Sequence, residues 1–298
     1  MKKGIALLIV VLLCACFACA LAEENKSEVY TSGDYRYILL ADGTVEITDY
    51  RGSETELEIP ATLDGHPVTS IGHRAFLWRS DLLRVSIPEG VTNIAKEAFA
   101  ACSGLTGVTL PGSITALGDR AFTDCVSLDG VQLPEGVTSM GEGVFSGCRS
   151  LTSLMIPEGV TAIGDSMFWS CRSLTGITIP ACVTQIGPCA FEDCTGLTEI
   201  ALPASLTSIG NNAFSGCESL TSITIPEGVT RIGSYAFSDC SSLTSITIPE
   251  GVTNIGDVIF VGCPQELTVI VVPGSEAERY CKEYGRNFIY PVMNEKGE

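Results

Sequence analysis

Cysteine is the most conspicuous reactive residue type in this chain, because eight thiols recur at one fixed spacing. They are Cys102, Cys125, Cys148, Cys171, Cys194, Cys217, Cys240 and Cys263. Beyond position 22 no C-x-x-C pair exists, which disfavours a metal site. In stacked coils equivalent Cα atoms lie about 4.8 Å apart, within reach of a disulfide, but parallel side chains fit its torsion poorly. We therefore expect buried free thiols that fill a slot too small for leucine.

Three further thiols depart from this spacing. Cys182 replaces a glycine at a corner of the repeat, and Cys189 replaces a variable residue. Neither has neighbours typical of a reactive thiol, so drift at exposed sites is favoured over a redox role or a local disulfide. Cys281 is expected on the apolar face of a C-terminal helix. Their oxidation state stays open at this point.

Histidine and carboxylate groups offer little catalytic chemistry. His66 and His73 are the only histidines, and the first regularly spaced Cys follows a full repeat later, so no Cys-His or Ser-His-Asp set is expected. Stacked corner glutamates could bind Ca²⁺ weakly, but no carbonyl co-ligands are evident and solvated charge is favoured. These pairs are Glu135 with Glu158 and Glu227 with Glu250. We expect no metal and no cofactor.

The two tryptophans, Trp78 and Trp169, are the remaining candidates for a contact. No aromatic residue recurs on the expected strand face, which disfavours a sugar-binding platform. For Trp169, half-buried packing is favoured over an exposed contact.

An internal repeat must position all of these groups, and its period is the step from Cys102 to Cys125. Phenylalanine keeps the same step at Phe76, Phe99, Phe122, Phe145, Phe168, Phe191, Phe214, Phe237 and Phe260. The segment SLTSITIPEGVT occurs at 219–230 and again at 242–253. Nine copies of P-E-G-V-T-x-I-G-x-x-A-F-x-x-C-x-x-L-T-x-I-x-I fit the chain, the first lengthened by an insertion around 63–67. Such a register predicts a solenoid.

The pattern inside the unit predicts its local structure. Leu-Thr-x-Ile-x-Ile alternates as a short strand does, and Pro-Glu-Gly forms a corner. Val-Thr-x-Ile-Gly predicts a second extended segment, and Ala-Phe-x-x-Cys one helical or 3₁₀ turn with Phe and Cys inward. Burial within one unit only offsets the backbone entropy of ordering it, so units must stack to fold.

Both ends of the stack need caps. Residues 35–40 and 45–48 predict a β-hairpin, and Ser275 begins a capping box for a short helix that ends near Gly285. We expect a signal peptide at 1–22, an N-terminal cap at 23–59, the solenoid at 60–272, and a C-terminal helical cap and tail at 273–298.

Residues 1–22 match a secretory signal peptide, with Lys2 and Lys3 before an apolar run and Ala20-Leu-Ala22 as the cleavage site. Their removal takes two Lys from the 17 basic residues and none of the 35 acidic ones, so the net charge becomes 15 − 35 = −20. Such a charge excludes nucleic acid as a partner. We expect an exported, secreted or surface-associated protein without a transmembrane span. A lipid anchor at Cys16 or Cys19 is the minority alternative.

The repeat L-T-x-I-x-I-P-x-x-V-T-x-I-G-x-x-A-F-x-x-C resembles that of the BspA-like bacterial leucine-rich repeat proteins, over residues 57 to about 272. The resemblance implies a right-handed stack of nine leucine-rich-repeat-like coils with short parallel strands. It also implies a secreted or surface-displayed, non-catalytic protein linked to adhesion. The family supplies no shared binding residues.

We therefore expect a non-enzymatic extracellular module that binds a protein of the host matrix or of a bacterial envelope. A structural spacer of the envelope is the alternative, and a solenoid enzyme acting on polysaccharide is a distant one. Arg149, Trp169 and Arg172 have nearly the same phase in neighbouring coils, which predicts separations of about 5–10 Å. They form the candidate partner contact, because tryptophan and arginine dominate binding energy at interfaces.

Overall fold

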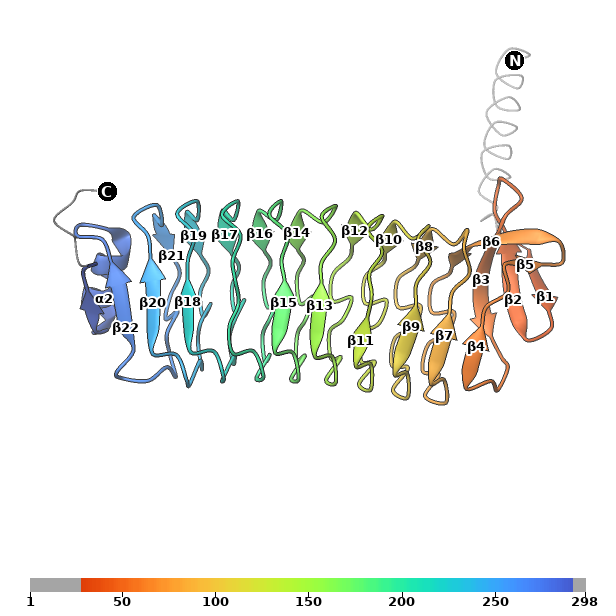
Figure 1. Ribbon diagram of the computed structural model, residues 1–298, viewed down its shortest axis with the longest axis horizontal. Helices are drawn as coiled ribbons and strands as arrows, with labels where there is room; N and C mark the ends of the chain where they lie inside the picture. The colour runs from red at the N-terminus through yellow and green to blue at the C-terminus, as the bar shows by residue number, and fades with distance from the viewer. Residues whose placement is uncertain (1–27, 292–298) are drawn as a thin grey trace, which may run out of the picture.

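The computed structural model describes residues 28–291 and forms an elongated row of stacked coils (Figure 1). The predicted signal peptide, the lipid-anchor cysteines and the end of the predicted tail lie outside the described residues. We number the coils 1 to 9 by their phenylalanine, from Phe76 to Phe260. Two extended segments and one turn segment alternate in each coil, so the repeat predicted from the sequence is the unit of the fold.

The first track of strands comes from the Leu-Thr-x-Ile-x-Ile segments. Its members are β7 (Arg84–Ser86), β9 (Gly107–Thr109), β11 (Gly130–Val131), β13 (Ser153–Met155), β15 (Gly176–Thr178), β18 (Ser222–Thr224), β20 (Ser245–Ile248) and β22 (Thr268–Val271). Neighbours pair in parallel exactly one repeat apart, as Val85 with Val108. The pairing is interrupted between β11 and β13, and residues 199–202 form no strand, so the track comprises three sheets.

The second track comes from the Val-Thr-x-Ile-Gly segments. Its members are β8 (Asn93–Ile94), β10 (Ala116–Leu117), β12 (Ser139–Met140), β14 (Ala162–Ile163), β16 (Gln185–Ile186), β17 (Ser208–Ile209), β19 (Arg231–Ile232) and β21 (Asn254–Ile255). Its isoleucines point inward, and Ile94 and Ile232 are fully buried.

The Phe ladder, defined as the nine phenylalanines 76 to 260, lies between the tracks and is fully buried. Adjacent rings are stacked with centroids 4.8 to 6.1 Å apart. Tyr50 of the N-terminal cap packs on Phe76 at 5.4 Å, and Tyr280 of the C-terminal cap meets Phe260 edge-on at 6.1 Å. Because each ring needs a neighbour on both sides, the caps provide an aromatic residue at each end.

The third segment of each coil, which we call the turn segment, differs from the helical or 3₁₀ turn expected. Hydrogen bonds from residue i+3 to residue i are present, as from the Cys102 N–H to the Phe99 carbonyl. Residues with positive φ interrupt them, for example Glu97 at +56° and Ala101 at +56°. Alternate N–H groups instead bond to the next coil, as Phe76 does to Ala98. The segment is therefore a series of tight turns bound from coil to coil.

The N-terminal cap is larger than the predicted hairpin. β2 (Tyr35–Leu39) and β3 (Val45–Tyr50) form that hairpin, and β1 (Val29–Ser32) adds a strand to it. β3 continues in parallel into β6 (His66–Ile71). The insertion in coil 1 makes a second hairpin of β5 (Thr62–Leu63) with β6. β4 (Glu56–Glu58) already pairs with β7, so the first track begins before residue 60.

The C-terminal cap is the helix α2 (Glu276–Tyr284) followed by β23 (Phe288–Ile289), which pairs with β22. Ser275 caps the helix by accepting from the Glu278 N–H, and Gly285 ends it at φ +65°. Ala277, Tyr280 and Cys281 form the buried apolar side of the helix, which does not include Tyr284. Tyr284 is 39% exposed and stacks on Tyr280 at 4.5 Å, because it lies one turn beyond the last coil.

Candidate functional site

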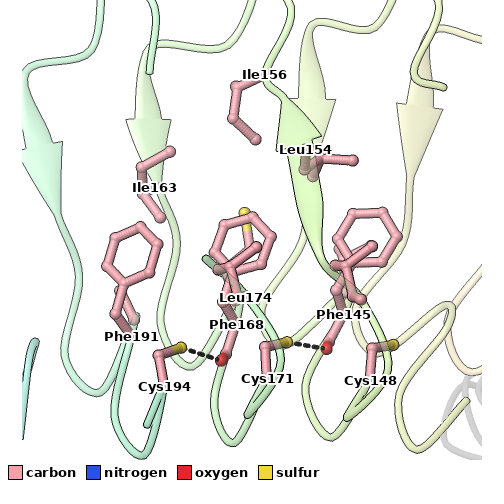
Figure 2. Close-up of a cluster of buried hydrophobic side chains, with 14 of the residues drawn as sticks. Phe145, Cys148, Leu154, Ile156, Ile163, Phe168, Cys171, Leu174, Phe191 and Cys194 are labelled. Atoms are coloured by element: carbon pink, nitrogen blue, oxygen red, sulfur yellow. Dashed lines mark hydrogen bonds between the residues drawn. The ribbon is translucent and has the colours of Figure 1, made fainter. Parts of the chain in front are cut away.

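The Cys ladder, defined as the eight thiols 102 to 263, lies beside the Phe ladder and contains no disulfide. Each thiol donates a hydrogen bond to the carbonyl of the ladder Phe in the preceding coil, as Cys171 does to Phe145 at 3.1 Å and Cys194 to Phe168 at 3.1 Å (Figure 2). Across the ladder these distances range from 3.0 to 3.3 Å. In coils 1 to 7 the same Phe carbonyl also accepts a hydrogen bond from the N–H three residues later in its own coil. The thiol therefore satisfies the second lone pair of that carbonyl oxygen.

Burial makes the middle of the Cys ladder, at Cys148, Cys171 and Cys194, unsuited to nucleophilic chemistry. It raises the pKa of Cys171 to about 12 and the pKa values of Cys148 and Cys194 well above the usual thiol range. Because the thiolate is the reactive form, these groups stay neutral and inert. Their role is to pack and to donate a hydrogen bond between coils.

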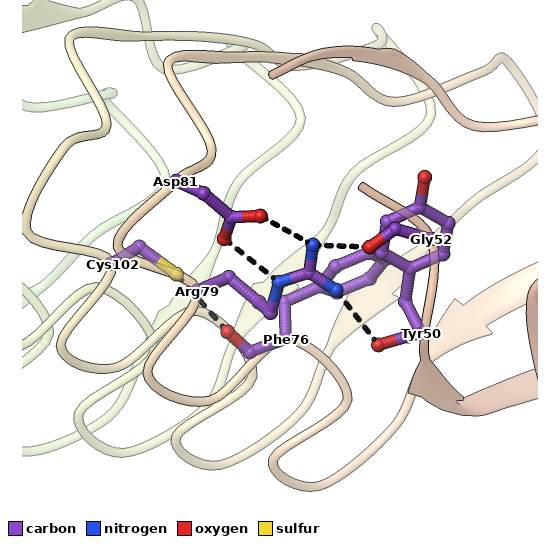
Figure 3. Close-up of polar contacts among 6 residues, drawn as sticks. All are labelled: Tyr50, Gly52, Phe76, Arg79, Asp81 and Cys102. Atoms are coloured by element: carbon purple, nitrogen blue, oxygen red, sulfur yellow. Dashed lines mark hydrogen bonds and ion pairs between the residues drawn. The ribbon is translucent and has the colours of Figure 1, made fainter. Parts of the chain in front are cut away.

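Arginine replaces the thiol at both ends of the Cys ladder. Arg79 occupies the Cys position of coil 1, and its Nη1 donates to the Tyr50 carbonyl at 3.0 Å while Nη2 donates to Gly52 (Figure 3). Asp81 holds the guanidinium from the other side at 2.8 Å. At the far end Arg286 donates to the Phe260 carbonyl. Each of these arginines therefore joins a cap to the adjacent coil, as the thiols join one coil to the next.

The thiols outside the Cys ladder also have structural contacts. Cys182 is half-buried and donates to the Glu158 and Val160 carbonyls, as Ser205 does to Val183 one coil later. Cys281 is buried in the cap. Cys189 is half-buried on the turn segment, and burial raises its pKa to about 11. None of the three forms a disulfide.

The histidines and the corner glutamates do not assemble a reactive centre. His66 Nδ1 lies 2.9 Å from the Gly43 carbonyl and His73 Nδ1 lies 2.9 Å from that of Lys96, so each tethers backbone. The predicted glutamate pairs lie at the solvent-facing corners. Among residues 28–291 no group of three or more His, Cys, Asp or Glu side chains is placed to hold a metal ion.

The outer surface of the turn segments, which we call the turn face, has an unusual backbone. At the second position before each ladder Phe and at the second position after it, φ is positive in all nine coils. The positions before Phe are Arg74, Glu97, Arg120, Gly143, Ser166, Cys189, Asn212, Tyr235 and Val258. Those after it are Trp78, Ala101, Asp124, Gly147, Ser170, Asp193, Gly216, Asp239 and Gly262. This conformation favours glycine, asparagine and aspartate, and is costly for bulky residues.

A groove of about 630 Å³ runs along the turn face over coils 1 to 6. Trp78 lines it in coil 1 and Trp169 in coil 5, with exposed fractions of 73% and 40%. Both tryptophans of the chain therefore lie in one hollow, although they belong to coils 1 and 5. Ala100, Ala101 and Leu77 supply apolar floor between and beside them. We call this feature the turn-face groove.

Two arginines also line the turn-face groove. Arg74 is paired with Glu97 at 2.6 Å, and this hydrogen bond lowers the pKa of the Glu97 carboxyl. Arg120 is exposed and forms no ion pair within residues 28–291. Sequence reasoning noted no role for Arg74, since nothing in the repeat marks its backbone as left-handed.

The predicted contact residues are only partly together. Trp169 lines the turn-face groove, but Arg149 and Arg172 do not. Both arginines are exposed directly after their ladder Cys, where the coil leaves the turn face for the first track. Arg172 Nε donates to the Ser170 hydroxyl at 3.3 Å. Trp78, which was not among the predicted contact residues, lines the groove together with Trp169.

The first track presents a different hollow, of about 500 Å³, over β4, β7, β9 and β11. Its lining includes Glu56, Glu58 and Arg84 with glycine, serine and threonine, but no aromatic residue.

Within residues 28–291 no helix is long and apolar enough to cross a bilayer.

Comparison with known proteins finds a matching family and solved structures with a similar architecture. A family model described as "BspA type Leucine rich repeat region (6 copies)" matches residues 69–194 and 161–281. The chain is 33% identical to a leucine-rich cell surface protein of Faecalibacterium prausnitzii, with TM-score 0.65 over 83% of this chain and 77% of that one. It is 32% identical to a leucine-rich repeat protein of T. pallidum, with TM-score 0.61 over 65% of this chain and 91% of that one.

No curated protein matches the chain. The family match spans most of the described residues, and the solved relatives share both sequence and coil geometry. The chain belongs to the BspA-type leucine-rich repeat family.

Proposed function

We propose that this chain is a non-enzymatic extracellular protein-binding module and that the turn-face groove is its contact surface. The strongest support comes from the backbone conformation and the exposure of Trp78. A tryptophan at φ +64° occupies a strained backbone position, and 73% of its surface is exposed to solvent. Folding gains little from such a side chain, and strain of this kind is typical of functional sites.

The composition of the turn-face groove supports a protein partner. Tryptophan and arginine dominate binding energy at protein interfaces, and the groove has Trp78, Trp169 and the unpaired Arg120. The cell-surface location named for the F. prausnitzii relative and the predicted signal peptide support an extracellular setting. A host matrix protein or a bacterial envelope protein, bound in adhesion, fits that setting.

A spacer role is the second candidate, for the C-terminal coils. The identical segments at 219–230 and 242–253 give the strand tracks that join coil 7 to coil 8 and coil 8 to coil 9 the same residues, and specific recognition needs coils that differ. These coils lie beyond the turn-face groove. Their regular stacking would hold the turn-face groove at a fixed distance from the C-terminal cap.

A capture experiment with matched variants tests the proposal. Immobilised residues 23–298 are exposed separately to solubilised matrix proteins and to bacterial envelope fractions. The groove variant combines Trp78→Gly with Trp169→Ser, the residue type found at the equivalent position 146. The control is Tyr235→Gly, which removes another aromatic residue, 46% exposed, from a left-handed position outside the groove.

We expect a protein that the wild type and the control retain and that the groove variant loses, with at least a tenfold change in Kd once it is purified. Melting temperatures of all three chains establish that each is folded. The proposal is wrong if neither fraction contains a bound protein, or if the groove variant retains the same proteins with Kd within twofold.

A further inference from the structure

The turn-face groove is strongly acidic between its two tryptophans. Asp124, Glu142 and Asp165 are exposed and line it, and Glu192 lies at its end in coil 6. The Glu97 charge is neutralised by Arg74, so Arg120 alone opposes four carboxylates. Within the described residues no side chain forms an ion pair with any of these four.

The fold leaves one of these carboxylates, Asp165, free for a local reason. Asp119 of coil 3 accepts the N–H of Glu142 in coil 4 at 3.0 Å and so binds two coils together. Asp165 has the same position in coil 5, but the corresponding residue in coil 6 is Pro188, which has no N–H to donate. The carboxylate of Asp165 therefore serves no coil-to-coil contact of this kind.

The length of the turn-face groove fits an extended chain. It crosses six coils, and five steps of about 4.8 Å span roughly 24 Å. An extended polypeptide rises about 3.3 Å per residue, so roughly seven residues fit along it. Exposed Trp78 and Trp169 offer aromatic faces to cations, which bind indole better than other rings.

We propose that the turn-face groove binds an extended protein segment that bears lysine or arginine side chains. Its carboxylates pair with the cations, and its tryptophans cover their alkyl stems and charged heads. This proposal rests on the proposed function and names the chemistry of the partner. Unpaired acidic groups in a hollow also speed the encounter with a cationic segment, in a manner that salt weakens.

Tryptophan fluorescence reports directly on this site, because Trp78 and Trp169 are the only tryptophans in the chain. The probes are two octapeptides without aromatic residues, one alternating Lys with Ser and the other alternating Glu with Ser. We expect the Lys peptide to change the emission saturably and the Glu peptide to leave it unchanged. Raising NaCl from about 50 to about 300 mM is expected to weaken Lys-peptide binding at least fivefold, because the shorter Debye length screens the pairs.

Matched charge variants separate the groove from the general acidity of the protein. Glu142→Gln with Asp165→Asn removes two charges inside the groove, and Glu227→Gln with Glu250→Gln removes two outside it. Isothermal titration measures Kd for each, since it detects binding at any site. We expect about a tenfold loss for the groove pair and less than twofold for the outside pair.

Equal losses in both pairs, or a Lys peptide that leaves the tryptophan emission unchanged, would overturn the cationic assignment. The proposed function is judged separately, by the capture experiment. If a captured protein needs Trp78 and Trp169 but is not displaced by the Lys peptide, the groove binds protein and its partner is not cationic.

Discussion

The interior and the turn face of this solenoid are built from the same segment of each coil, yet they tolerate very different residues. Inside, all nine coils have Phe and eight have Cys at fixed positions. Outside, the left-handed positions vary among arginine, tryptophan, cysteine, valine, glycine and others. Stacking requires identical rings to meet inside the coils, whereas the turn face requires only a backbone conformation.

This difference indicates where function can be sought. A substitution in the interior changes the packing against the coils on both sides. The residue type at an interior position therefore reflects the stability of the stack. A bulky and mostly exposed side chain at these positions, as at Trp78, costs stability and gains little core contact. The presence of such a side chain on the turn face therefore indicates a role other than stabilising the fold.

The largest expected effect is on the interior, through pH. Burial raises the pKa values of Cys148, Cys171, Cys194 and Cys217, while unfolded thiols ionise above about pH 8.5. The stability from their neutral burial is therefore complete below about pH 8.5 and is lost as pH rises. Between pH 7.5 and 9.5 the ionisation of each thiol in the unfolded chain removes about 1.4 kcal/mol of stability, so the four together remove about 5.6 kcal/mol.

Urea unfolding under reductant at pH 7.5, 8.5 and 9.5 measures this loss. Cys171→Ala is the matched variant and should reduce the loss by about 1.4 kcal/mol. A free energy of unfolding that does not change over this range would show that the thiols are not buried as neutral donors.

Removing one ring sharpens the comparison within single coils. Phe191→Ala opens a cavity in mid-stack and should cost about 3–5 kcal/mol. Tyr235→Ala removes a similar ring from the turn face, where it is 46% exposed, and should change stability by less than about 0.5 kcal/mol. Denaturant titration of both variants tests this, and similar losses would show that the turn face also supports the stack.

A smaller contrast is expected between two arginines of coil 1. Arg79→Leu leaves the Tyr50 and Gly52 carbonyls without their donors and should cost about 2 kcal/mol. Arg74→Leu breaks only a partly exposed ion pair on the turn face and should cost less than about 1 kcal/mol. The melting temperatures of the two variants provide the measurement, and a larger drop for Arg74→Leu would reverse the assignment.

The stacking interior could be predicted from sequence because it repeats. The constant spacing of Phe191 and Cys194 from their equivalents determines which side chains face inward. Ser275 and Gly285 mark the helix ends, since capping depends on local chemistry. The arginines that replace the thiol at the ends of the Cys ladder were not predicted. Arg79 stands at a Cys position, but its partner Tyr50 belongs to the cap and lies outside the repeat.

The turn-face groove could not be predicted in the same way. Left-handed positions are usually inferred from glycine, and here glycine occupies four of eighteen, two in each of nine coils. Without that backbone, Trp78 and Trp169 seem unrelated, since they stand at different positions of the repeat. Arg149 and Arg172 share a phase, but the coil turns away from the groove before reaching them.

The turn face keeps Trp78 at a cost to folding, and the stability of Trp78→Gly tests this most directly. Glycine relieves the strain at φ +64° and the lost side chain is mostly exposed, so unfolding free energy should stay equal or rise by up to about 1 kcal/mol. Trp78→Ala, which keeps a Cβ, should be about 1 kcal/mol less stable than Trp78→Gly. A loss of more than about 1 kcal/mol in Trp78→Gly, the threshold beyond ordinary surface changes, would show that Trp78 serves the fold, and would contradict the account.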